Sequence, residues 1–144
     1  MRLLLKNAHL YRHQAFSDTD VLIEDGKIKE IGTDLEAGDA SVYDAAGKIV
    51  TPGLIDLHVH FREPGQEAKE TFESGSKAAA AGGFTTVCTM PNTNPVVDSA
   101  AIVRSLEKRA EDTACVHVKI IGAVTKNQEG KELAELGDMI QEGA

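Results

Sequence analysis

Residues 52–60 read Pro-Gly-Leu-Ile-Asp-Leu-His-Val-His, an apolar run that begins after a turn and carries polar side chains at alternate positions. Side chains two residues apart on a β-strand point to the same side, so Asp56, His58 and His60 are expected on one face. Two imidazoles at the end of such a strand can bind one ion such as zinc. The alternative is an ordinary structural or surface pair, because His-x-His alone is a weak signal.

Strands and helices alternate after this stretch. Apolar runs between turn residues predict strands, helical periodicity predicts helices, and Gly82-Gly83 is a natural helix end. The expected elements are a strand over 54–59, a helix over 67–81, a strand over 84–89, a helix from its cap Asp98 to Arg109, a strand within 114–124 and a helix from 130 to about 142. This alternation predicts parallel βαβ units with right-handed crossovers, and hence an α/β fold.

The first fifty residues contain short apolar runs and turns instead. Strands are expected over 3–10, 21–23, 28–32, 42–44 and 47–50. Asp25-Gly26 lies between apolar runs and predicts a tight type I′ hairpin. Fifty residues of strands cannot form a large core, so this part is expected to need strands from elsewhere. The change of character at 51–53 predicts two domains, 1–52 and 53–144.

Two loop residues are candidates for substrate binding. Arg62 follows the His-x-His strand, and its guanidinium can hold a carboxylate through two parallel hydrogen bonds. Asn92 lies in the loop after the second strand, beside the loop that carries Arg62, and its amide can donate and accept hydrogen bonds. The alternatives are a solvated arginine for Arg62 and simple turn chemistry beside proline for Asn92.

Composition limits the classes of partner. The formal net charge of −8 argues against nucleic acid and anionic membranes, which require a basic surface. No apolar stretch reaches membrane-spanning length, no signal peptide is recognisable, and Cys88 and Cys115 are expected as buried reduced thiols, so the cytoplasm is the expected location. The other histidines lack partners at ligand spacing and are expected to be structural or exposed: His9, His13 and His117.

The motifs together resemble class I dihydroorotases of the amidohydrolase superfamily. The similarity runs through residues 52–65, 80–86, 90–95 and 121–133, and so covers essentially the whole chain. Arg62 with Pro91-Asn92-Thr93 is its most specific part. Allantoinases tend to have asparagine where Arg62 stands, and hydantoinases lack the Arg-Glu-Pro-Gly run.

The resemblance implies a (β/α)8 TIM barrel with a small β-sandwich formed by both chain ends. It implies a zinc-dependent cyclic amide hydrolase that interconverts N-carbamoyl-L-aspartate and L-dihydroorotate in pyrimidine biosynthesis, with one or two zinc ions. His58 and His60 match the first two zinc ligands, and Arg62 and Asn92 match residues that hold the substrate carboxylate. A small-molecule substrate and a homo-oligomer are expected, without nucleic acid or membrane.

Length is the departure from the family pattern. A (β/α)8 barrel takes about 250 residues, whereas this chain supplies three βα units. The family places its further metal ligands and its general base on later strands, so no catalytic residue is expected within this chain. We expect it to be inactive alone, until a missing C-terminal part or a second polypeptide completes it. The alternatives are a catalytically silent scaffold subunit and an allantoinase- or hydantoinase-type enzyme.

Overall fold

The computed structural model describes all residues from Met1 to Ala144. The chain divides into two compact units, Met1–Pro52 and Gly53–Ala144, and each is described by itself. No helix in either unit combines the length and the apolar character needed to cross a membrane.

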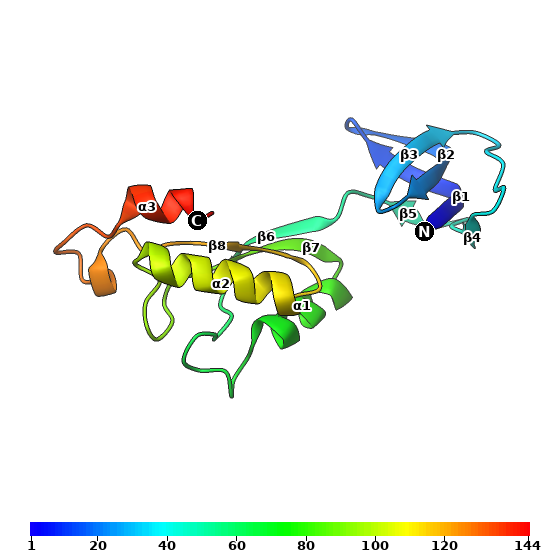
Figure 1. The fold of residues 1–144 in the computed structure, drawn as a ribbon. Coiled ribbons are helices and arrows are strands. Elements are labelled where there is room, and N and C mark those ends of the chain that lie inside the picture. The colour runs from blue at the N-terminus through cyan, green and yellow to red at the C-terminus, as the bar shows by residue number, and fades with distance from the viewer. The chain divides into compact units, whose positions relative to one another are not determined.

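The N-terminal unit is a five-stranded mixed sheet (Figure 1). Strand β1 pairs antiparallel with β2 and parallel with β4 and β5, while β2 pairs antiparallel with β3. The strands are β1 (Arg2–Arg12), β2 (Ala15–Glu24), β3 (Lys27–Gly32), β4 (Ser41–Asp44) and β5 (Ile49–Val50). The expected strands are therefore present, although β1 and β2 are longer than the sequence predicted.

Two tight hairpins shape this sheet. Asp25 and Gly26 have φ values of 49° and 75°, which confirms the predicted type I′ turn between β2 and β3. The turn between β1 and β2 was not predicted. It uses His13 and Gln14, with φ values of 51° and 62°, and it contains no glycine, the residue that usually marks such a turn.

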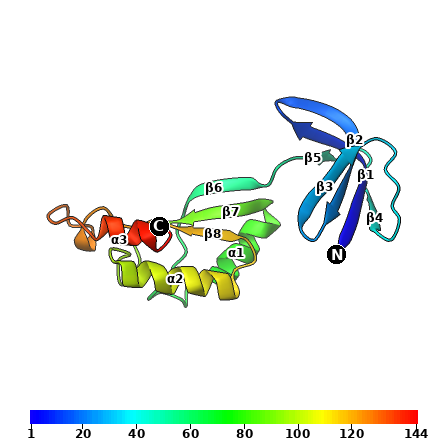
Figure 2. The same cartoon turned by 45° about the horizontal axis from the view of Figure 1, so that its top comes forward.

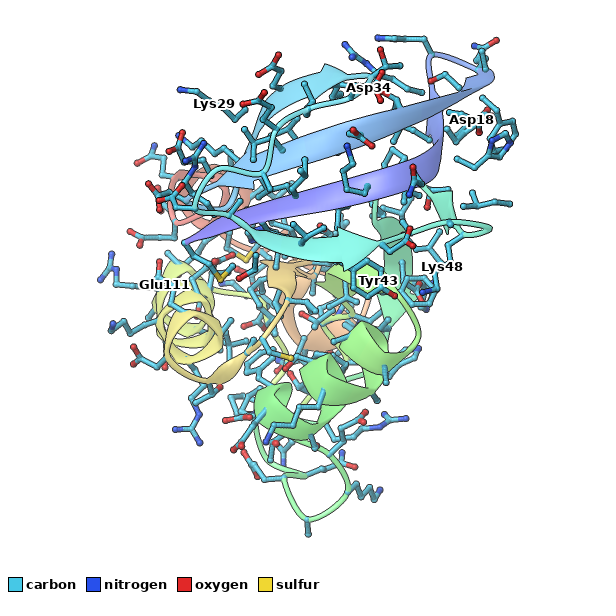
Figure 3. All side chains as sticks on the ribbon, turned by 90° about the vertical axis from the view of Figure 1, so that its right-hand side faces the viewer. Asp18, Lys29, Asp34, Tyr43, Lys48 and Glu111 are labelled. Carbon is cyan, nitrogen blue, oxygen red and sulfur yellow. The ribbon has the colours of Figure 1, made fainter.

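Tyr43 in β4 and Lys48 just before β5 lie side by side on the surface of the N-terminal unit (Figure 3). The Lys48 ammonium donates to the Tyr43 hydroxyl at 2.6 Å and lies 4.5 Å from the centre of its ring. These contacts hold the turn between β4 and β5 against the end of β4.

The C-terminal unit is built on a parallel sheet in the order β6-β7-β8, with α1 and α2 on one face (Figures 1 and 2). The parallel βαβ arrangement confirms the α/β prediction. The elements are β6 (Leu54–Val59), α1 (Phe72–Ala81), β7 (Phe84–Thr89), α2 (Ala100–Thr113), β8 (His117–Ile120), the 3₁₀ turn η1 (Lys126–Gln128) and α3 (Leu136–Gln141).

The helix boundaries differ from the prediction because other residues cap them. Helix α1 begins at Phe72 rather than at residue 67, since Thr71 and Ser74 form a reciprocal capping box. Helix α2 begins after Ser99. The expected cap Asp98 instead accepts a hydrogen bond from the backbone N–H of Asn127 at 2.8 Å.

The third helix is also shorter than predicted. It begins at Leu136 rather than at residue 130, because the preceding chain folds back and Leu133 pairs with Thr125 in an isolated antiparallel bridge. Gly130 has a φ of 73°, which no helix accommodates. The acidic and basic residues of this segment therefore lie mostly on a turn and not on a helix face.

The core of the C-terminal unit lies between the sheet and its two helices. Phe61 and Phe72 meet edge to face with ring centres 5.9 Å apart. The cluster also contains buried residues of β7, β8, α2, α3 and the loop before α2: Val87, Val97, Val103, Leu106, Ala110, Val118, Ile120 and Met139. The prediction of two buried thiols is wrong for Cys115, which precedes β8 and is exposed, while Cys88 in β7 is half-buried.

Candidate metal and substrate site

The two histidine rings converge just beyond the carboxyl end of β6. Their Nε2 atoms lie 3.2 Å apart, and the ring centres are separated by 5.0 Å. The backbone N–H of His58 donates to the carboxylate of Asp56 at 3.0 Å, where the pairing of β6 with β7 shifts register. The structure thus brings the predicted ligand pair, His58 and His60, to one point.

Asn92 joins this pair from the loop after β7. Its Oδ1 lies 2.9 Å from Nδ1 of His60. An amide oxygen only accepts, so the proton of His60 is on Nδ1 and a lone pair is on Nε2, which faces His58. This is the tautomer that binds a metal through Nε2. The amide NH₂ of Asn92 forms no hydrogen bond within the chain and can donate to a ligand.

Arg62 stands two residues after His60, half-buried on the same loop. Its backbone carbonyl accepts from the N–H of Gln66 at 2.9 Å, while its guanidinium takes part in none of the ion pairs of the chain. The structure therefore brings both His58 and Asn92 into contact with His60. The Arg62 side chain follows them closely in the sequence and forms no ion pair.

The loops after β6 and β7 touch through their backbones. The N–H of Asn94 donates to the carbonyl of Pro64 at 3.1 Å. A Cβ atom on Gly65 would lie 1.9 Å from the Asn94 carbonyl oxygen, and Gly65 has a φ of +91°. The N–H of Gly65 also donates to Glu67, and this hydrogen bond lowers the pKa of the Glu67 carboxyl. Only glycine permits the close approach of residue 65 to the Asn94 carbonyl.

Glu63 was not singled out in the sequence, yet its carboxylate is buried in this loop with 7% exposure. It accepts hydrogen bonds from Nε of Arg109 at 2.7 Å and from the N–H of Phe72 at 2.9 Å. It lies in a polar, turn-rich run, and glutamate side chains are seldom buried unless they are paired. No local pattern reveals a partner 46 residues away.

The paired nitrogens fit a zinc ion. Zn–N bonds near 2.05 Å at the tetrahedral angle place two ligand nitrogens about 3.3 Å apart, close to the 3.2 Å between the Nε2 atoms of His58 and His60. No group of three or more His, Cys, Asp or Glu side chains is arranged around one point in the chain. The chain thus offers two nitrogen donors, whereas a catalytic zinc usually has three protein ligands.

The remaining histidines have other surroundings. His9 pairs with Asp18 at 2.7 Å and stacks on Phe16 with ring centres 4.7 Å apart. His13 accepts a hydrogen bond from the Arg12 side chain on the exposed hairpin, and His117 is exposed at the start of β8.

A sequence profile described as "Dihydro-orotase-like" matches residues 47–144, which include every residue of this site. The chain belongs to the dihydroorotase family. A dihydroorotase from Halalkalibacterium halodurans is 51% identical over 145 residues, and one from Caldicellulosiruptor saccharolyticus is 49% identical over 146 residues. These alignments cover 100% and 99% of this chain and 34% of each relative. The resemblance drawn from the motifs is therefore confirmed.

This member of the dihydroorotase family is also similar to solved hydantoinase structures. The D-hydantoinase from a Thermus species superposes with a TM-score of 0.76 and 34% identity over 96% of this chain and 30% of that one. The fold of this chain is thus that of the N-terminal region of such enzymes. The chain spans about a third of the length of the dihydroorotases that it matches.

Proposed function

We propose that this chain is the N-terminal segment of a zinc-dependent dihydroorotase that interconverts N-carbamoyl-L-aspartate and L-dihydroorotate in pyrimidine biosynthesis. The proposal rests above all on the Nε2 atoms of His58 and His60, which converge at 3.2 Å beside Asn92. The 49–51% identity to dihydroorotases, against 34% to a hydantoinase, favours dihydroorotate over a hydantoin as substrate.

His58 and His60 would hold the metal, as one or two zinc ions. Zinc in such a site makes activated water available near neutral pH and polarises a carbonyl group. Asn92 fixes the His60 ring with its Nε2 lone pair toward His58, so that the ligand pair is organised in advance. The pair lies at the carboxyl end of β6, and α/β barrels place their active sites at the carboxyl ends of their strands.

Arg62 and the amide NH₂ of Asn92 would bind the substrate carboxylate. A guanidinium and an amide donor suit a planar carboxylate, and both lie on loops next to the histidine pair. Anchoring the carboxylate there orients the ring, so that its amide carbonyl faces the metal. Specificity for an acidic cyclic amide follows from this anchor.

The rest of the site would come from the part of the enzyme that this chain does not contain. A complete (β/α)8 barrel with its β-sandwich would add the further metal ligands and the general base, and the full enzyme would be a cytoplasmic homo-oligomer. Both cysteines are free, in keeping with a reducing compartment. On this proposal the chain alone does not turn over substrate.

The test uses the full-length protein with this segment, purified and analysed for zinc, with dihydroorotate as substrate. We expect bound zinc and turnover, and in Arg62→Ala a rise of about 10- to 100-fold in KM, because a charge-assisted carboxylate anchor is lost. Lys69→Ala, a neighbouring cation that contacts Gln66, is the matched control and should leave KM unchanged.

Other outcomes identify the alternatives. Hydantoin turnover without dihydroorotate turnover would assign a hydantoinase-type enzyme. Bound zinc without any cyclic amide turnover would instead favour a catalytically silent scaffold.

A further inference from the structure

The residue directly after Arg62 is the buried carboxylate of Glu63. Its two oxygens have separate partners: Oε1 accepts from Nε of Arg109 in α2, and Oε2 accepts from the N–H of Phe72, the first residue of α1. A buried carboxylate is costly unless its oxygens are hydrogen-bonded and its charge is paired. Both conditions are met here, so Glu63 ties the loop to two helices at once.

The neighbours of Glu63 extend this anchorage at alternate positions. Phe61 is 5% exposed and packs on Phe72, and Gly65 lies against the carbonyl of Asn94. Residues 61, 63 and 65 are therefore all fixed to the body of the unit. Arg62 lies between two of them, and its side chain has no ion-pair partner. The backbone of Arg62 is thus held on both sides by anchored residues, which limits the space that its side chain can reach.

We propose that Glu63 and Arg109 are positioning residues for substrate binding, and that their ion pair holds Arg62 where it meets the substrate carboxylate. This inference rests on the proposed dihydroorotase function. It gives α2 a part in substrate affinity through Arg109, whose side chain is 56% exposed and touches no residue of the metal pair. The pair acts on binding of the carboxylate and leaves the chemical step to other groups.

The test compares Glu63→Gln, Arg109→Gln and the double variant in the full-length enzyme. Because a displaced Arg62 weakens an anchor but leaves the metal ligands in place, KM for dihydroorotate should rise about three- to tenfold while kcat changes less than about twofold. The double variant should be no worse than the more severe single one, since both substitutions break one interaction. Lys77→Gln, which removes a cation and breaks the exposed pair with Glu73 in α1, is the matched control and should leave KM unchanged.

Two further measurements separate positioning from general stability. Arg109→Lys keeps a cation near Glu63 and should recover part of the lost affinity. Hydrogen exchange of residues 61–66, followed by mass spectrometry, should be faster in E63Q and R109Q and unchanged in K77Q. Should E63Q fail to fold, R109Q carries the comparison, because its side chain is more than half exposed.

The outcomes are distinct. An active wild type with unchanged KM in both variants, and only a lower melting temperature, would overturn the positioning role and leave the proposed function standing. A wild type that binds zinc but does not turn over dihydroorotate would overturn the proposed function, and with it the substrate part of this inference.

Discussion

At the scale of single residues, Asn92 combines two tasks in one amide group. Its oxygen pairs with Nδ1 of His60 at 2.9 Å, and its nitrogen, which has no partner within the chain, is the donor that we propose for the substrate. Neither task can be performed by a hydrocarbon side chain, and a carboxylate could perform only the first. The roles of the amide oxygen and of the amide nitrogen can therefore be tested separately by substitution.

In the full-length enzyme, Asn92→Asp should keep the acceptor for His60 and remove the donor to the substrate. Zinc affinity should stay within about threefold of wild type, because the carboxylate still accepts from His60. KM for dihydroorotate should rise more than about tenfold, because a negative charge replaces the donor to the substrate carboxylate. Asn92→Leu should lose zinc affinity as well, measured by competition with a chelator. Asn94→Asp, which adds the same charge to the same loop, is the control, and an equal loss of affinity in it would contradict the assignment.

Asp20 provides a second residue-scale prediction. Burial alone would raise its pKa, but hydrogen bonds from the Lys6 ammonium and from the N–H groups of Asn7 and Leu35 outweigh burial and lower it. A pKa lowered by folding stabilises the protein above the unfolded value near 3.8, and this contribution is lost as the pH falls through the lower folded value.

Asp20→Asn should therefore reduce the free energy of unfolding at pH 7 by about 1–3 kcal/mol. The difference from wild type should shrink as the pH falls below the unfolded pKa. Urea unfolding of the full-length protein at neutral and acidic pH measures both effects, with Asp18→Asn on the exposed hairpin as the control. A difference that stays constant with pH would contradict the role of the ionised carboxylate.

At the scale of elements, the sequence predicted strands better than helix ends. Alternating polarity located β6, and the apolar run 84–89 matches β7. The starts of α1 and α2 were misplaced because several residues in each run could serve as the cap, and tertiary contacts decided among them. Asp98 is used by the loop of η1, which leaves Ser99 at the start of α2.

In the site, too, local patterns were predictable from the sequence, whereas contacts between distant residues were not. A period of two suffices to place His58 and His60 on one side of a strand. The ion pair between Glu63 and Arg109 joins residues 46 positions apart, and the contact of Gly65 with Asn94 depends on how two loops meet. Such contacts arise from packing of whole elements, which no local pattern encodes.

The capping box of α1 leads to an element-scale prediction. Thr71→Ala removes the side-chain acceptor for the N–H of Ser74, and should lower the free energy of unfolding by about 1 kcal/mol. Thr71→Ser keeps the hydroxyl and should stay close to wild type. Chemical unfolding of the full-length protein compares them. Equal stability of the alanine and serine variants would show that α1 is fixed by packing alone.

At the scale of the whole molecule, both units expose apolar surface. In the C-terminal unit, the edge strand β6 leaves Ile55 and Leu57 at 61% and 71% exposure. In the N-terminal unit, one region of the sheet forms an open hollow of about 740 Å³. Its apolar lining includes Leu5, Leu10, Val21, Ile23, Ile28, Ile31 and Val50. Exposed strand edges and apolar patches of this kind favour association.

We therefore expect the 144-residue chain, expressed by itself, to associate or to melt without a cooperative transition. Size-exclusion chromatography and a thermal melt test this. Leu57→Lys places a charge on the open edge and should reduce association, whereas Lys69→Ala on a loop should not. A monomer with a sharp melt would contradict the prediction.

The contact between Gly65 and the Asn94 carbonyl has a consequence for attempts to redesign the proposed site. In a library that randomises both loops, most members would have separated loops, because even the methyl group of an alanine at position 65 would clash with the Asn94 carbonyl. New substrate preferences should be sought by changing other side chains of these two loops, while Gly65 is kept.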